Sequence, residues 1–189
     1  LADLKDGLRY INHQPKVRNA LIQLIILFSI FAALAVLAVR LPEILPGMRA
    51  SQFGFLLAAV GVGMAAGATT VGYLGHKFSH SQLSLIGSIG MAIALIGLSA
   101  FTHHLWISVL FITLLGVFAA VVGVPMQTTI QAETPEEMRG KVFGLQNNAT
   151  NIALSLPLAL AGVAETFLGL PTVFLALAGL AIVGGVLTW

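Results

Sequence analysis

The sequence predicts an all-α membrane protein, a polytopic bundle of six transmembrane helices. Of its 189 residues, 58% are hydrophobic and only 8% are charged, whereas about a quarter of the residues in an ordinary soluble domain are charged. The charged residues also gather in short islands between long apolar runs. So few charges cannot cover a water-facing surface, but they suit a bundle whose outer surface meets lipid.

Six apolar segments remain when the sequence is cut at every charged residue and histidine. They contain 21 to 28 residues each and cover 19–39, 51–75, 81–102, 105–132, 142–164 and 166–189. About 20 helical residues cross the roughly 30 Å hydrocarbon core of a bilayer. Each segment is therefore long enough to span the membrane with some tilt.

Residues 1–18 form a separate segment ahead of the first span. Leu1, Leu4, Leu8 and Ile11 recur at helical spacing among charged residues, and Pro15 interrupts the pattern. One interpretation is a short amphipathic helix on the inner membrane surface. The other is a solvated linker whose leucines recur by chance. We expect a cytoplasmic segment at 1–18 and a six-helix bundle at 19–189.

The distribution of Lys and Arg predicts the orientation. Six spans place both ends of the chain on one side of the membrane, and the loops on the cytoplasmic side carry the excess of positive residues. Only Arg40 and Arg49 lie on the opposite side. The terminal side has seven: Lys5, Arg9, Lys16, Arg18, Lys77, Arg139 and Lys141. Both ends are therefore predicted to be cytoplasmic.

The predicted spans lack the usual residues of an enzyme or a metal site. No charged residue lies deep in a span, and only Arg40 and Glu165 approach the outer ends. All five histidines fall in loops or span ends, and the sequence has no cysteine. We predict no enzymatic activity, no cofactor, no metal and no nucleic-acid partner. Glu165 is either a solvated cap between two spans or the titrating group of proton-coupled transport.

Amide side chains gather at the inner ends of the fourth and fifth spans. Gln127 and Gln131 lie one turn apart, and Asn147, Asn151 and Ser155 recur at every fourth position. Amides are costly in lipid unless they meet a partner or water. Two interpretations stay open: Gln127, Gln131, Asn147 and Asn151 form a substrate vestibule or inner gate, or the amides staple the two spans together.

Small residues and one proline predict local features of the spans. Gly63 and Gly67 match the small-x-x-x-small pattern of close helix contacts. In a chain with several spans we expect this pair to pack internally and not to form a dimer. Pro125 should weaken the fourth helix locally, as a gating hinge or as a static kink.

Three stretches resemble the major facilitator superfamily of transporters. Residues 72–77 (Gly-Tyr-Leu-Gly-His-Lys) resemble its Gly-x-Leu-x-Asp-Arg/Lys loop signature. Residues 134–142 and 4–10 are similar to two cytoplasmic loops of its enterobactin-exporter and macrolide-efflux branch. Val124-Pro125, Gln146-Asn147 and Asn151 also look somewhat like its lysophospholipid transporters. The motif residues are Gly72, Gly75, His76, Lys77, Arg139 and Gly140.

The resemblance implies the C-terminal half of a twelve-helix fold with a central site between two six-helix halves, an arrangement for which this superfamily is itself a standard example. The N-terminal half of the same chain, the bilayer and a small-molecule substrate would then be its partners. His76 stands where the family usually has aspartate, so a charge-paired latch there would be absent or pH-dependent.

The function implied is secondary active transport at the cell's inner membrane, with export of a small amphipathic molecule by alternating access. Two alternatives remain. One is translocation of lysophospholipid or another lipid by the same fold, and the other is a scaffold or receptor that does not transport.

Overall fold

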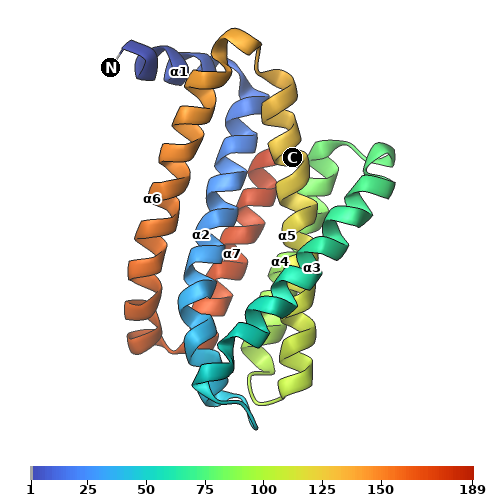
Figure 1. Ribbon diagram of the computed structural model, residues 1–189, viewed down its shortest axis with the longest axis vertical. Coiled ribbons are helices and arrows are strands. Elements are labelled where there is room, and N and C mark those ends of the chain that lie inside the picture. Colours follow the sequence, from blue (N-terminus) through green and yellow to red (C-terminus); the bar gives the residue numbers. More distant parts are fainter. Residues whose placement is uncertain (1) are drawn as a thin grey trace.

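The computed structural model describes residues 2–189, and the side chains of 5–49 and 51–189 (Figure 1). Within these residues the secondary structure is helical, as predicted, with no strand. The elements are α1 (Ala2–His13), α2 (Pro15–Ile44), η1 (Ala50–Gln52), α3 (Phe53–Leu74), η2 (Gly75–Lys77), α4 (His80–Ala100), α5 (Leu105–Glu133), α6 (Glu136–Leu168) and α7 (Leu170–Thr188). Helices α2 to α7 are long and apolar enough to cross a membrane.

The helices extend beyond several of the predicted spans. Helix α2 begins four residues before position 19 and continues through Arg40, while α6 begins six residues before position 142 and continues past Glu165. Charged residues end an apolar run, but they need not end a helix. Glu136 and Glu137 favour the first turn of α6 because the N-terminal end of a helix is electropositive. The helices are therefore longer than the apolar segments from which the spans were predicted.

Two connections show how short loops stop and restart the helices. Ser79 caps α4: its hydroxyl accepts a hydrogen bond from the Gln82 amide nitrogen, and the Gln82 side chain accepts one from the Ser79 nitrogen. Gly169 joins α6 to α7 with a φ of 77°, a conformation that favours glycine. The adjacent helices α6 and α7 therefore reverse direction within a single residue.

Helix α2 lies at the centre of the bundle. It packs against α5, α6 and α7, while α4 packs between α5 and α7, and α3 lies along α5 (Figure 1). The fully buried side chains include Ile30, Leu37, Met91, Leu95 and Phe174. Helices α3 and α6 bury the smallest share of their surface and lie on opposite flanks. We call the end of the bundle that carries α1 the α1 end, and the opposite end the far end.

Glycines bring α3 and α5 into direct backbone contact. A Cβ atom on Gly63 or Gly67 would clash with the carbonyl oxygen of Thr113 or Val117, respectively. In return, a Cβ on Gly116 would clash with the carbonyl oxygen of Val60. Such close approach gives van der Waals contact that lipid cannot supply. The prediction that Gly63 and Gly67 pack internally is confirmed.

A buried hydrogen bond that the sequence pattern did not reveal joins α2 to α4. The Gln23 Nε2 atom donates to Ser88 Oγ over 2.7 Å, and both side chains are buried. Two glycines of α7 make the space, because a Cβ on Gly184 or Gly185 would meet Gln23 or Ser88. This polar link, formed by Gln23, Ser88, Gly184 and Gly185, fixes three helices at one level of the apolar core.

Residues 2–13 form helix α1, which packs against the α1 ends of α6 and α2. Lys141 Nζ lies 2.9 Å from Asp6 Oδ2, and the Tyr10 hydroxyl donates to the Glu133 carbonyl oxygen over 2.9 Å. Burial raises the pKa of Tyr10, and the negative charge of Glu133 adds to the shift. Leu8 is 53% exposed, and the side chains of Leu1 and Leu4 lie outside the described ones. The segment is thus helical, as one of the two interpretations required.

Candidate functional site

An apolar groove opens between α2, α3 and α5 in the half of the bundle nearer the α1 end. Its volume is about 730 Å3. Aliphatic and aromatic side chains of α2 and small side chains of α3 and α5 line it, including Phe28, Ala65 and Ala120. Gln127 and Thr128 are its polar side chains, and both lie toward its α1 end. Because the Thr128 hydroxyl donates to the Val124 carbonyl oxygen, Gln127 is the stronger candidate for binding a ligand there.

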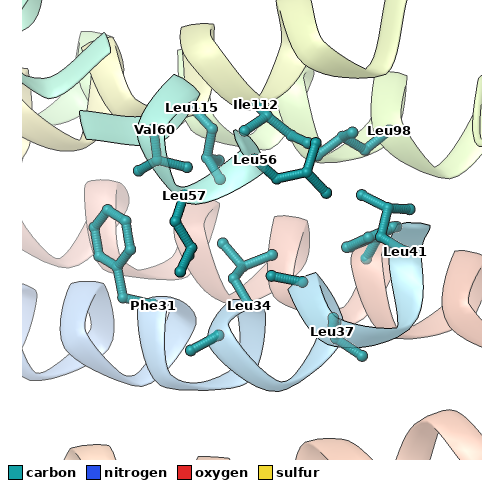
Figure 2. Close-up of a pocket in the computed structure, with 13 residues that line it drawn as sticks. Phe31, Leu34, Leu37, Leu41, Leu56, Leu57, Val60, Leu98, Ile112 and Leu115 are labelled. Carbon is teal, nitrogen blue, oxygen red and sulfur yellow. The ribbon is translucent and has the colours of Figure 1, made fainter. Parts of the chain in front are cut away.

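A second, smaller cavity continues the groove toward the far end. It has a volume of about 140 Å3, and its thirteen lining residues are all apolar. Figure 2 shows Leu34 of α2 facing Leu57 and Val60 of α3, with Leu115 of α5 beside them. The cavity thus lies where α3 crosses close to α2, and side chains from both helices line it and leave it open on one side.

Phe31 lines both the groove and the cavity. Along α2 the groove residues precede Phe31 and the cavity residues follow it. Helices α3 and α5 run in the opposite direction, and in both the cavity residues come before the groove residues. Groove and cavity therefore form one path, with Phe31 at the junction. From Gln127 to Leu115 the path follows twelve residues of α5, or about 18 Å at the helical rise per residue.

A hydrogen bond between two amides closes the α1 end of this path. Gln146 Nε2 of α6 donates to Gln127 Oε1 over 2.7 Å. The Gln146 Oε1 atom is buried and has no hydrogen-bond partner among the described residues. One amide pair thus joins α5 to α6, as the staple interpretation expected, while Gln127 also lines the groove, as the vestibule interpretation expected.

The other predicted amides do not join these helices. Asn147 and Asn151 are exposed on α6, and neither side-chain amide has a hydrogen bond to the part of the chain that the structure describes. The Asn151 carbonyl oxygen accepts the Ser155 hydroxyl, a bond within the helix. Gln131 is also exposed and lies outside the groove. The structure therefore brings Gln127 and Gln146 together and leaves Asn147, Asn151 and Gln131 apart from them.

The predicted loop motifs lie partly inside helices. Gly72 is in α3, whereas Gly75, His76 and Lys77 form η2. Arg139 and Gly140 lie in the first two turns of α6, not in a loop. Arg139 reaches its own helix start, with Nη1 3.7 Å from Glu136 Oε1 and Nε 3.4 Å from the Thr134 carbonyl oxygen. The connection between α5 and α6 consists of Thr134 and Pro135 alone.

A polar pocket of about 400 Å3 lies at the α1 end between α2, α4, α5 and α7. The Thr129 hydroxyl donates to the Pro125 carbonyl oxygen, so His80 Nδ1, 2.7 Å away, must donate to Thr129. Lys16 Nζ pairs with Glu133 Oε1 at 3.0 Å in the same pocket. These contacts connect three helix ends. Sequence reasoning placed His80 at a span end but did not identify its partner.

Arg40 and Glu165 pair at the far end of the bundle. Arg40 Nε of α2 lies 3.8 Å from Glu165 Oε2 of α6, and Arg40 Nη1 lies 3.5 Å from Glu43 Oε2. Glu165 sits in the last turn of α6 with 19% of its side chain exposed. The idea of a solvated cap between two spans was therefore wrong. Helix α6 continues past Glu165, and the Glu165 carboxylate is largely covered and pairs with Arg40.

The sequence is similar to known transport proteins. Residues 20–189 match the profile of the Major Facilitator Superfamily. Over 116 residues the chain is 38% identical to proteins named enterobactin exporter EntS from Escherichia coli O1:K1 and from Shigella flexneri. This alignment covers 59% of the chain but only 27% of each relative. No solved structure matches the chain closely enough to count as similar.

The profile match covers nearly all of the chain, including all or most of each of the six helices long and apolar enough to cross a membrane. The exporters it resembles confirm the branch that the loop motifs suggested. The chain is a multi-pass membrane protein and belongs to the major facilitator superfamily.

Proposed function

We propose that this chain is the C-terminal half of a secondary active transporter that exports a small amphipathic molecule by alternating access. The observation that carries the proposal is the path between α2, α3 and α5, which is apolar along its length and has the Gln127 amide near one end. An amphipathic solute fits such a path, because its apolar part leaves water while its polar part keeps a hydrogen-bonding partner.

The named relatives support the direction of transport. The similar proteins from two enterobacteria are named as exporters. Their name also states a substrate, but the alignment covers about a quarter of their length, and a shared fold does not fix the substrate. Siderophores are therefore one class to test alongside drugs and lysolipids.

The exposed flanks of α3 and α6 support a missing partner half. Both helices expose small or polar side chains such as Ala65, Thr69 and Asn151 over much of their length. A second six-helix half of the same protein would cover these flanks and complete a central site. We place the α1 end in the cytoplasm because seven of nine basic residues lie on that side.

Lipid translocation is a second candidate, and the far-end cavity favours it. A cavity without a polar lining residue suits an acyl chain at least as well as an aromatic drug. The two candidates share the fold and the path, and they differ in whether the transported molecule must carry a long unbranched chain.

Flux into vesicles containing the full-length protein, with and without a pH gradient, tests the proposal across drugs, siderophores and lysolipids. We expect Gln127→Leu to raise the concentration needed for half-maximal flux about tenfold or more. The polar group of the ligand would then be buried without a hydrogen-bond partner. Asn12→Leu, an exposed amide on α1 that does not line the groove, is the matched control. Absence of flux for every class under both conditions would overturn the proposal.

A further inference from the structure

The far-end cavity has the size and the lining of a site for one apolar group. Enclosed cavities of about 150 Å3 with aliphatic and aromatic walls stay dry and bind benzene. This cavity of about 140 Å3 has walls of the same kind, although it is open on one side. A polar group placed there would lose its hydrogen bonds to water without replacement. The cavity therefore accepts hydrocarbon and rejects polar substituents.

The position of the cavity sets which part of a ligand reaches it. Gln127 lies about 18 Å from Leu115 along α5, and Phe31 stands at the junction between groove and cavity. A ligand whose polar part contacts Gln127 reaches the cavity only through a slender apolar extension. A compact ring system of similar mass in contact with Gln127 would not extend over this distance.

We propose that the cavity lined by Phe31, Leu34, Ala38, Leu57, Val60 and Leu115 is a subsite for the far end of a single alkyl chain, and that it selects the transported amphiphile by chain length. The inference rests on the proposed transport function and names the substrate class for the same path. The competing occupant is an acyl chain of a bilayer lipid that enters between α2 and α3.

Chain-length selectivity tests the proposal in vesicles with the full-length protein and amphiphiles that share one head group but carry progressively longer alkyl chains. Ala38→Leu adds atoms to the cavity wall and should move the preferred chain toward shorter homologues. The apparent affinity should fall about fourfold for each methylene group that no longer fits, equal to about 0.8 kcal/mol. Leu34→Ala should move the preference toward longer homologues.

Two control variants make the same changes of size outside the cavity. Ala176→Leu on α7 and Ile93→Ala on α4 alter exposed side chains that do not line the path, and they should keep the wild-type preference. An unchanged preference in both cavity variants overturns the subsite. So does a shift of equal size in the controls, which would reflect general packing or the bilayer.

A binding measurement separates the subsite from transport. Leu57→Trp places a fluorophore at the cavity wall, and an amphiphile brominated at the end of its chain should quench it in a saturable manner. Quenching without flux for any homologue supports the subsite and overturns the transport function on which it was built. Quenching by brominated bilayer lipid alone, with no response to the amphiphile, shows that membrane lipid fills the cavity and overturns the subsite.

Discussion

Helices α4 and α6 both expose a long face, but the two faces differ in chemistry. The exposed face of α4 contains Ile86, Ile89, Ile93 and Ile96, an unbroken aliphatic stripe. The exposed surface of α6 also has aliphatic side chains such as Ile152 and Leu156, but it carries in addition a run of amides and a hydroxyl, at Asn147, Asn148, Asn151 and Ser155. Hydrocarbon can surround the first face without cost, but it cannot satisfy the amides of the second. The bundle therefore has one side built for lipid and another that needs water or protein.

Helix α3 also has two different faces, one packed closely against α5 and one open. Its face toward α5 uses Gly63 and Gly67 for backbone contact, whereas a Cβ on Gly61 or Gly72 would meet nothing within 4 Å. The same residue type thus serves tight packing on one side and a smooth open surface on the other. The sequence does not show which glycines pack closely and which are open, because the two groups differ only in their position relative to α5.

A charge placed on each exposed face should give the largest difference between α4 and α6. Ile93→Arg puts a cation in the middle of the α4 stripe, where membrane insertion should cost about 2.5–3.5 kcal/mol. Ser155→Arg places the same charge midway along α6 and should cost less, because that face meets water or protein. The measurement is the inserted fraction of the full-length protein in a membrane insertion assay. Equal losses for both variants would show that lipid surrounds α6 as well.

Glycine substitutions sharpen the comparison within α3. Gly67→Leu would force α3 away from α5, at a cost of about 1–3 kcal/mol for overpacking. Gly61→Leu is the matched control, since open space surrounds that position. Thermal unfolding in detergent should separate the two variants. The contact between α3 and α5 would not be the tight one described if both variants melted alike.

Amide substitutions separate site from staple. Gln146→Leu removes the bond to Gln127 and should lower stability by about 0.6 kcal/mol, and by no more than about 1.7 kcal/mol. Asn151→Leu removes no hydrogen bond of its side chain and should leave thermal stability unchanged.

The readout is the thermal shift that substrate induces in the full-length protein. If Asn151 contributes to a vestibule, its substitution reduces that shift while the baseline stays in place. A lower baseline together with an undiminished substrate shift would contradict the vestibule and favour a structural role for the α6 face.

Only a small effect on stability is expected at Arg139. Its ion pair with Glu136 is exposed, and such pairs contribute about 0 to 1 kcal/mol. Arg139→Ala should therefore reduce transport more than folding. The checks are protein yield and flux per molecule in vesicles. Low yield with normal flux per molecule would mean that the arginine acts in folding or in topology.

The sequence alone predicted the helical class and the six spans, because apolar runs of bilayer length have few other uses. The apolar run at 142–164 does not show where α6 begins, since a helix can include Arg139 and Lys141 ahead of such a run. The bond between Gln23 and Ser88 was out of reach. It depends on how two helices that are not neighbours in the sequence lie in the bundle, and a single amide inside an apolar run carries no periodic signal of its partner.

The groove and its cavity could not be predicted for a related reason. Their walls consist of ordinary apolar residues such as Leu34 and Leu57, which have the same character as the residues of a closed core. The space exists because α3 is tilted relative to α2. The two helices lie close together at the far end of the bundle and further apart toward the α1 end. The amides at the end of the path were visible in the sequence because polar side chains are rare in these spans.

The polar link in the core has a consequence for how this protein can diverge. Gln23 and Ser88 occupy the space that Gly184 and Gly185 leave open. A larger residue at position 184 would displace the Gln23 amide from its bond, and a larger residue at position 185 would meet Ser88. Among relatives, these four positions should therefore change as a set, with each glycine retained wherever its polar neighbour is retained.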